Sequence, residues 1–273
     1  PDKHPYDRML DVYHGLDRNA PDAERIRTSI RAHLGMITHV DEYVGRVLNT
    51  LDTLGMRDDT IIVFTSDHGE MLGEHGMWFK RTYFEESAHV PLIVSWPGHI
   101  PAGVTEDIVS HVDLAPTFLD LVGAEPRKFG AGSQSLGTML RTGADAQWRS
   151  HARIDYLGDG TNKPMFMLRE GDWTLAYFPD FRPVLFNLAQ DPYETTDLAG
   201  QPEHSDRIAA MTRIIVGDLD VAGFVEAIKA MQKDRIFIQT ARQAAAAQPW
   251  DYQPFRDATR QYVRAAVNHS TSR

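Results

Sequence analysis

Two short β-branched runs without polar alternation constrain the fold of this chain most strongly. They are residues 60–65, Thr-Ile-Ile-Val-Phe-Thr, and residues 90–95, Val-Pro-Leu-Ile-Val-Ser. A strand that is apolar at successive positions is typically buried on both faces, as in a parallel sheet covered by helices. The two runs therefore predict core strands of an α/β layer.

Amphipathic helices are predicted on either side of these strands. Apolar residues recur every three or four positions from Ile26 to Leu54, which predicts a long helix, and Gly55 follows as its C-cap. Residues 114–122 predict a second helix, with Asp113 as its N-cap. Helix, strand, strand and helix joined by short links are typical of α/β layering.

The remaining segments predict loops and a second subdomain. Residues 1–22 are polar and favour a loop, and the glycine-rich residues 124–150 favour a surface loop or domain junction. Beyond them, short strands separated by turns indicate an antiparallel subdomain. Its expected strands are 165–169, 174–178 and 184–188, and its expected helices are 203–217 and 223–246. We place the boundary between 1–150 and 151–273.

The first strand run ends in Ser66-Asp67-His68-Gly69. In open α/β sheets, ligands bind beyond the carboxyl ends of the strands. A carboxylate and an imidazole at that edge offer oxygen and nitrogen ligands to a divalent cation, and glycine allows a sharp turn. A plain surface turn is the alternative, and the tetrapeptide alone favours it.

The segment after this turn is rich in glycine and ends in Lys80. Such a loop can approach an oxyanion closely, and a lysine supplies a point charge to it. Taken alone, Lys80 is more typical of a solvated surface residue. His75 is a further candidate for contact with a substrate, although a loop residue that bonds to its neighbours is the simpler interpretation.

Residues 66–76, followed by Trp78 and Lys80, closely resemble the second signature region of sulfatases in the alkaline phosphatase superfamily. They are also similar to the related phosphonate monoester and phosphodiester hydrolases. The resemblance covers about residues 25–200 in order. The further matching segments are 84–94, 96–98, 112–117, 185–188, 191–194 and 197–199.

The resemblance implies an alkaline phosphatase-like α/β sandwich with a mostly parallel, here incomplete, central sheet. A small antiparallel C-terminal subdomain and a helical or extended C-terminal arm complete it. The incomplete sheet is expected to expose apolar edges and faces, which favours association or poor solubility.

The resemblance also implies a metal site. Asp67 and His68 would be ligands of one divalent cation, Ca²⁺ or Mn²⁺, with Mg²⁺ as a further candidate. Lys80 would hold a sulfate or phosphate oxygen and take part in catalysis, and electrostatic clamping of the developing charge would supply much of the rate. The histidine at position 68 resembles the choline sulfatase and phosphonate hydrolase branch.

One part of the family pattern is absent. Sulfatases attack with a formylglycine made in a Cys/Ser-x-Pro-x-Arg motif of the N-terminal half, and this chain has no cysteine and no Ser-x-Pro-x-Arg. We therefore expect that the chain is a C-terminal half without a nucleophile, whose partner is the missing N-terminal half. Alone it should not turn over substrate, and it should bind metal weakly.

The C-terminal segments 249–258 and 261–264 resemble the arm of choline sulfatases, which reaches a neighbouring subunit. A homo-oligomer built through this arm is therefore expected. Trp250 is a candidate for contact with a quaternary ammonium substrate, although simple anchoring of the arm by burial is the plainer interpretation.

The net charge of −10 disfavours a nucleic-acid partner, and no apolar run is long enough for a transmembrane segment. The compartment stays open between cytoplasm and periplasm for a soluble enzyme of bacterial type. Three functions remain: hydrolysis of small sulfate monoesters, with choline sulfate as one candidate; hydrolysis of phosphonate monoesters or phosphodiesters; and a non-catalytic role in assembly. The predicted metal ligands and Lys80 serve both anions, so they do not separate the first two.

Overall fold

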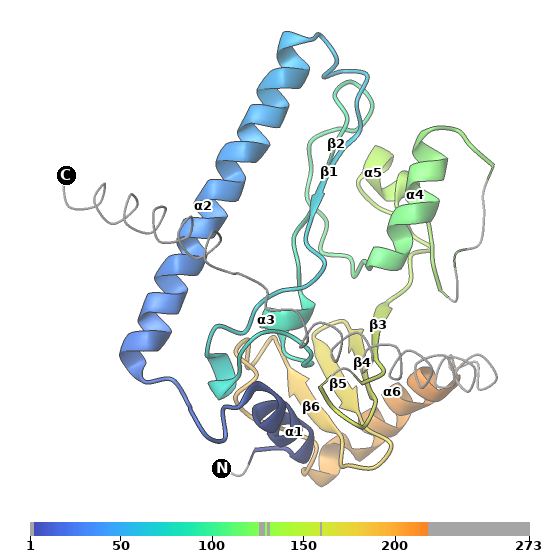
Figure 1. The fold of residues 1–273 in the computed structure, drawn as a ribbon. Helices are drawn as coiled ribbons and strands as arrows, with labels where there is room; N and C mark the ends of the chain where they lie inside the picture. The colour runs from blue at the N-terminus through green and yellow to red at the C-terminus, as the bar shows by residue number, and fades with distance from the viewer. Residues whose placement is uncertain (1–2, 126–128, 130–131, 159, 218–273) are drawn as a thin grey trace, which may run out of the picture. The chain divides into compact units, whose positions relative to one another are not determined.

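The structure, a computed structural model, describes residues 3–125, 129, 132–158 and 160–217 of the 273-residue chain (Figure 1). Pro1–Ala20 and Leu48–Asp218 form one compact unit, and Pro21–Val47 belongs to a second unit. The first unit holds both β-sheets and the candidate site residues that the structure describes.

The long helix predicted from the apolar periodicity is present as α2, Ala23–Thr53. Its end agrees with the predicted cap, because Gly55 adopts the left-handed conformation with a φ of 64°. The apolar stripe that gave the prediction is exposed in the described chain, where Leu34 is 56% and Val47 61% accessible.

The two β-branched runs form β1, Ile62–Thr65, and β2, Leu92–Ser95, but they pair antiparallel, with Ile62 opposite Ser95. The prediction of parallel pairing is therefore wrong for the described residues. A parallel pair needs a crossover, usually a helix, that carries the chain back to the opposite end of the sheet. The connection 66–91 instead leaves and re-enters at the same end, and its only α-helix is the single turn of α3, Glu85–Ala88.

The prediction that β1 and β2 are buried on both faces is also wrong within the described chain. Phe64 is 39% and Ile93 59% accessible. These side chains form the apolar face that we expected an incomplete sheet to expose. Whether that face causes association stays a prediction.

The second sheet is antiparallel, as predicted, with the strand order β3-β4-β5-β6 (Figure 1). The sequence analysis missed β3 and located the other three strands. The bounds are His151–Tyr156 for β3, Met165–Glu170 for β4, Trp173–Tyr177 for β5 and Val184–Asn187 for β6. The proposed boundary at residue 150 stays a prediction.

This sheet is covered on both faces. Leu168, Leu175 and Leu185 are paired across neighbouring strands and fully buried, on the face contacted by α6, Ser205–Gly217. The opposite face, which includes Met167 and Phe186, belongs to the main hydrophobic cluster. Strand residues alternate between the two faces, so the side chains on both faces are buried. The helix predicted at 203–217 is thus confirmed, with a 3₁₀ turn, η3 Pro202–His204, before it.

The main cluster also contains a helix that the sequence analysis assigned to a loop. Residues Pro5–His14 form α1, in which Pro5 occupies the first turn and the His4 ring accepts a hydrogen bond from the Tyr6 backbone N–H at 3.3 Å. Tyr6 and Leu10 are fully buried. The prediction was wrong because Tyr6 and Leu10, four positions apart, are among the few apolar residues of a mostly polar segment, so the helical periodicity is weak.

The helix predicted after residue 113 is α4, Leu114–Leu121, but the Asp113 side chain does not cap it. Asp113 lies in the 3₁₀ turn η2, His111–Asp113, and is fully buried. Its carboxylate accepts from the backbone N–H groups of Ser110 at 2.8 Å and Gln134 at 3.0 Å, and it pairs with Arg149. The cap prediction was therefore wrong, because burial beside an arginine gives this carboxylate stronger partners. The segment 124–150 also holds a short helix, α5 Gly137–Thr142.

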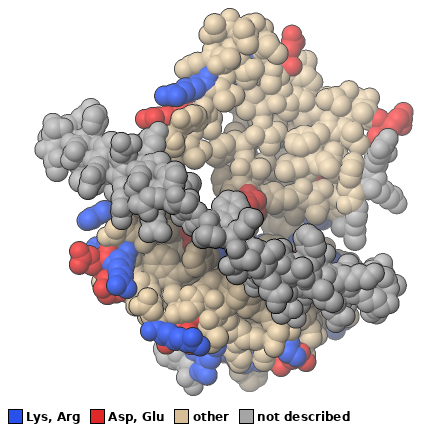
Figure 2. Space-filling view, viewed as in Figure 1, with Lys and Arg blue, Asp and Glu red and all other residues tan. Residues whose placement is uncertain are grey.

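Among the described residues, no helix has the length and apolar character needed to cross a membrane. On the face in Figure 2, basic and acidic side chains of the described residues are interspersed rather than gathered by sign. The absence of a nucleic-acid partner stays a prediction. The predicted helix at 223–246 and the C-terminal arm with Trp250 lie outside the described residues.

Candidate functional site

The turn that follows β1 holds the two predicted metal ligands side by side. The hydroxyl of Ser66 donates to the carbonyl of His68 at 2.8 Å, and the backbone N–H of His68 donates to Asp67 Oδ1 at 3.1 Å. These local bonds shape the turn and leave the Asp67 side chain 84% accessible. The ligand pair is thus presented outward from the end of a strand.

The ring orientation of His68 determines which nitrogen is available. Nδ1 lies 2.8 Å from the carbonyl oxygen of Gly69, and because a carbonyl only accepts, Nδ1 carries the proton of the neutral ring. Nε2 therefore presents a lone pair, and it lies 3.2 Å from Asp67 Oδ2. Two acceptors at this distance repel unless a proton or a cation lies near both.

This donor set fits a divalent cation, because a carboxylate oxygen and an imidazole nitrogen converge on one point. The backbone bond at Nδ1 is the kind of supporting contact that fixes a ligating histidine. The described residues contain no group of three or more His, Asp or Glu side chains that could hold a metal. Asp67 and His68 therefore form part of a site, and their role as ligands stays a prediction.

Gly69 is required at this turn for a reason that the sequence did not show. Its φ angle is not positive, but its backbone N–H donates to the carbonyl of Ser87 in α3 at 2.9 Å. A methyl group on Gly69 would lie 2.8 Å from the carbonyl carbon of Glu86 and closer still to its oxygen. Only a residue without a side chain lets the turn pack this closely on α3.

The glycine-rich loop that carries Lys80 is compact and strained. Met71 and Met77 are buried, and the Met71 N–H donates to the Phe79 carbonyl at 2.8 Å. Within the described chain, five residues other than glycine have a positive φ, and four of them lie in this loop: Leu72, His75, Phe79 and Arg81. Such strain persists only where surrounding contacts enforce it, and it is enriched at functional sites.

Helix α1 supplies hydrogen bonds that hold this loop in its conformation. The Tyr6 hydroxyl donates to the carbonyl of Arg81 at 3.1 Å, and the Tyr83 hydroxyl donates to Asp7 at 2.9 Å. The two loop residues that make these bonds, Arg81 and Tyr83, closely follow Lys80 in the sequence. Burial raises the pKa of Asp7 to about 7, despite the hydrogen bond from Tyr83. None of these supporting residues was predicted.

Lys80 itself is partly exposed, and its charge contributes to the electrostatic environment of Asp67. Partial desolvation acts to raise the pKa of Asp67, but the positive charge that His68 carries when its ring is protonated, two backbone hydrogen bonds and the charge of Lys80 outweigh it. The pKa of Asp67 therefore lies below its ordinary value. The contribution of Lys80 is the smallest of these, and its contact with an anion stays a prediction.

His75 lies in the same loop but is held by an aromatic neighbour. Its ring stacks on Phe84 with centroids 3.8 Å apart and planes 6° apart, and Nε2 is 4.0 Å from a carboxylate oxygen of Glu86. Burial lowers the pKa of His75, although Glu86 acts to raise it. These contacts support the simpler interpretation of a loop residue bonded to its neighbours, and a contact with substrate stays a prediction.

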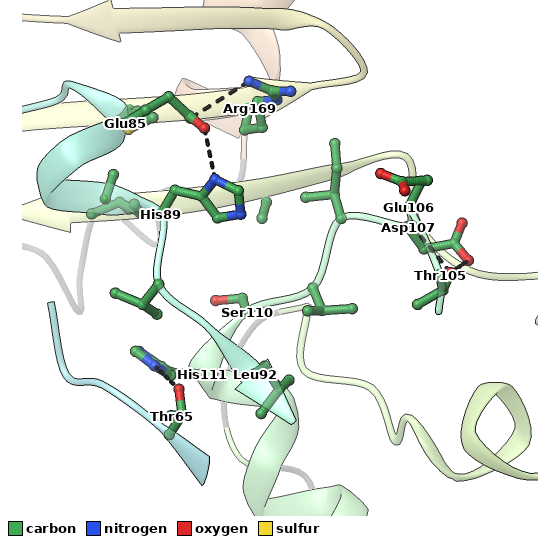
Figure 3. A pocket seen from close by; sticks show the side chains of 17 residues that line it. Thr65, Glu85, His89, Leu92, Thr105, Glu106, Asp107, Ser110, His111 and Arg169 are labelled. Atoms are coloured by element: carbon green, nitrogen blue, oxygen red, sulfur yellow. Dashed lines mark hydrogen bonds and ion pairs between the residues drawn. The ribbon is translucent and has the colours of Figure 1, made fainter. Parts of the chain in front are cut away.

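A cavity of about 330 Å³ lies beside the end of β1 (Figure 3). Thr65 and His111 approach each other there, with Oγ1 and Nε2 3.4 Å apart. At its other side Glu85 binds His89 and Arg169, as the dashed lines show. The cavity is also lined by apolar side chains, among them Val90, Leu92 and Ile154. The carboxylate of Glu85 joins the residue that follows α3, His89, to Arg169 of β4.

The sequence as a whole matches known families along its length. The sulfatase family pattern matches residues 3–124, the N-sulphoglucosamine sulphohydrolase C-terminal pattern matches residues 73–218, and the choline sulfatase C-terminal pattern matches residues 226–270. The first two matches overlap over residues 73–124, and all three run in chain order.

Individual relatives agree with the family matches. The chain is 34% identical to a choline-sulfatase of Rhizobium meliloti, over 91% of this chain and 49% of the relative. It is 33% identical to an N-acetylglucosamine-6-O-sulfatase of Bacteroides thetaiotaomicron, over 68% of this chain and 35% of the relative. The chain thus spans half or less of the length of these relatives.

The fold agrees as well. The structure is similar to that of a phosphonate monoester hydrolase from Silicibacter pomeroyi, with a TM-score of 0.68 and 32% identity. That similarity covers 80% of this chain and 48% of the hydrolase.

Proposed function

Because this chain belongs to the sulfatase family of alkaline phosphatase-like hydrolases, we propose that it contributes metal ligands and an anion-binding lysine to an enzyme that hydrolyses sulfate monoesters. The observation that carries the proposal is the convergence of Asp67 Oδ2 and His68 Nε2, 3.2 Å apart, at the end of β1. The identity to a choline-sulfatase over 91% of the chain supports the sulfate ester.

Asp67 and His68 would hold the divalent cation, which is Ca²⁺ or Mn²⁺, with Mg²⁺ as a further candidate. When bound, such a cation polarises an ester oxygen and stabilises negative charge. The chain's own contribution is to fix the two ligands: the bond from His68 Nδ1 to the Gly69 carbonyl aims Nε2 outward, and the bond to Asp67 Oδ1 turns the other oxygen toward it.

Lys80 would bind a free oxygen of the sulfate. Because α1 and the strained loop fix its backbone, little ordering of that backbone remains when the anion binds. A fixed positive charge is worth more to the transition state, where charge on the sulfate oxygens and leaving group grows, than to the substrate. Lys80 is thus proposed to act in catalysis as well as in binding.

The attacking group would come from outside this sequence, which has no cysteine and no Ser-x-Pro-x-Arg. We propose that a formylglycine in an N-terminal half supplies it, and that this half packs with the present chain. Choline sulfate is the proposed substrate, supported by the match of residues 226–270 to the choline sulfatase C-terminal pattern. Assembly into a homo-oligomer through the same segment is part of the proposal.

Hydrolysis of phosphonate monoesters is the second candidate. The similarity to a phosphonate monoester hydrolase, at a TM-score of 0.68, favours it specifically. Lys80 and the ligand pair suit a phosphonate oxygen as well as a sulfate oxygen, so the anion must be decided by assay. A role in assembly without catalysis is less favoured, because the ligand pair and its supporting bonds are intact.

The test is to measure, with the complete protein in which this chain occurs, hydrolysis of choline sulfate and of p-nitrophenyl phenylphosphonate. A higher kcat/KM for choline sulfate supports the proposal, and a higher value for the phosphonate moves the function to the second candidate. Lys80→Ala should lower kcat about 100-fold or more. The matched control Lys163→Ala, which removes an exposed lysine paired with Asp180, should leave kcat unchanged.

A further inference from the structure

The turn that bears the proposed metal ligands rests on helix α3. Gly69 is bonded to the carbonyl of Ser87 at 2.9 Å, and the carbonyl of Glu86 fills the space where a side chain on Gly69 would lie. The turn cannot shift toward α3, and it cannot shift away without breaking this bond. The placement of Asp67 and His68 therefore follows the placement of α3.

Helix α3 is too short to hold its own position. It has four residues, and its N-cap residue, Phe84, makes no side-chain capping bond. A single helical turn is unstable by itself, and its first N–H groups need partners. One partner comes from far along the chain: Oε2 of Glu194 accepts from the backbone N–H of Glu85 at 2.7 Å, across 109 positions.

The sequence around Glu194 builds a tight turn that aims its side chain inward. The turn follows β6, where the Asp191 N–H donates to the carbonyl of Asn187 at 2.8 Å. Asp191 then accepts from the Glu194 and Thr196 backbone N–H groups, through its carbonyl at 3.1 Å and its carboxylate at 2.7 Å. Glu194 takes a left-handed φ of 50° and is only 3% accessible. A glutamate in a strained, buried position requires a compensating role.

The protonation state of the Glu194 carboxyl group is compatible with accepting a hydrogen bond from the N-terminus of α3. Burial raises the pKa of Glu194 to about 8, although the bond from the Glu85 N–H acts to lower it. The neutral acid therefore dominates at neutral pH. Its second oxygen, Oε1, is buried without a hydrogen-bond partner among the described residues. A glutamine has the same shape, keeps one acceptor and is neutral, so it is a close substitute.

A second contact from the C-terminal subdomain supports α3. Arg169 of β4 approaches Oε1 of Glu85 at 3.5 Å, while Oε2 of Glu85 binds His89 at 3.0 Å (Figure 3). The contact from Arg169 is long and partly exposed, so it is weaker than the 2.7 Å hydrogen bond that the Glu85 N–H donates to Glu194. Arg169 joins α3 to strand β4 of the second sheet, and Glu194 joins α3 to the turn that follows β6.

We propose that Glu194 is a positioning residue for the metal-ligand turn, acting through α3 on Gly69. The C-terminal subdomain would thereby determine the geometry of Asp67 and His68 through α3. The metal part of this inference rests on the proposed function. The positioning part concerns the turn alone and can be measured without metal.

The experiment compares Glu194→Ala and Glu194→Gln with the unmodified complete protein. Hydrogen exchange at the Gly69 amide reports the bond to Ser87, and titration of Mn²⁺ into chelator-treated protein gives the metal Kd. Met211→Ala is the matched control, because it removes a fully buried side chain from α6, whose main contacts are with β4, β5 and η3. It should lower thermal stability and leave both readouts unchanged.

Glu194→Ala should speed exchange at Gly69 and raise the Kd about 10–100-fold, as loss of a ligand-supporting contact does. Glu194→Gln should restore both. The inference is overturned if Glu194→Ala matches Met211→Ala in both readouts, or if glutamine behaves as alanine. If the unmodified protein binds no Mn²⁺, the proposed function fails at this site, and the exchange rates alone then decide whether Glu194 holds the turn.

Discussion

Replacement of Gly69 by alanine tests the close packing of the ligand turn on α3. The added methyl group would lie 2.8 Å from the carbonyl carbon of Glu86. An ordinary contact between carbon atoms is about 3.5–4.0 Å, and the Glu86 oxygen lies closer still, so the turn and α3 must separate by at least about 1 Å. That movement breaks the 2.9 Å bond from Gly69 to Ser87.

The cost follows from these two effects. Overpacking typically costs about 1–3 kcal/mol, and the lost hydrogen bond adds about 1 kcal/mol. We therefore expect Gly69→Ala to destabilise the complete protein by about 2–4 kcal/mol. In a domain of this size that lowers the thermal midpoint by roughly 5–15 °C. Metal affinity should fall in parallel, because the ligands precede the altered residue directly.

Calorimetry and metal titration provide the assay, with Gly103→Ala as the matched control. Gly103 has no atoms within 4 Å of an added methyl group and no positive φ, so its replacement should leave both quantities unchanged. Equal thermal midpoints for the two variants would refute the reasoning about Gly69. A destabilised Gly69→Ala with unaltered metal affinity would separate the packing of the turn from ligand placement.

Three further predictions test the supporting structure. Leu10→Ala should destabilise the protein by about 2–5 kcal/mol in denaturant unfolding, because α1 is part of the core; an effect below about 0.5 kcal/mol would contradict that placement. Arg149→Ala should cost about 3–5 kcal/mol by the same assay, because it leaves the fully buried Asp113 unpaired; a neutral result would contradict the ion pair. Asp7 has its pKa raised from 3.8 to about 7, so its contribution to stability falls as pH rises between these values. The stability of Asp7→Asn relative to the unmodified protein should therefore increase by up to about 1.4 kcal/mol per pH unit over that range, and a constant difference would refute the shift.

The sequence was sufficient to locate the turn that bears the candidate ligands at the end of a strand, because the signals for that turn are local. Asp67, His68 and Gly69 follow a β-branched run, and the structure places them at the end of that strand. The long helix and the three strands of the second sheet were also predictable, since periodicity and turn residues act within a few positions.

The supporting contacts were not predictable, because they are long-range. No pattern near Glu194 indicates that its carboxyl group bonds to Glu85, and nothing near Gly69 indicates the approach of the Glu86 carbonyl. The antiparallel pairing of β1 and β2 was missed for a related reason. Apolar runs indicate burial but not strand direction, which depends on the course of the intervening connection.

Helix α1 shows a different limit. Its apolar contribution to the core comes from Tyr6 and Leu10, which are too few to stand out from polar neighbours. The signal that was available was the combination of Pro5 in the first turn with Gly15 after the last, which marks the two ends of a helix. Attention to end signals rather than to hydrophobicity would have located this helix.

The central claim is that Asp67 and His68 hold the divalent cation of a sulfate-ester hydrolase. The most direct test is the metal content of the complete protein, measured by mass spectrometry together with choline sulfate hydrolysis, for the unmodified protein and for the Asp67→Asn/His68→Gln double variant. The control is Asp59→Asn, which removes an exposed carboxylate shortly before β1. We predict bound divalent metal and turnover in the unmodified and control proteins, and loss of both in the double variant. Metal content and turnover retained in the double variant would contradict the claim.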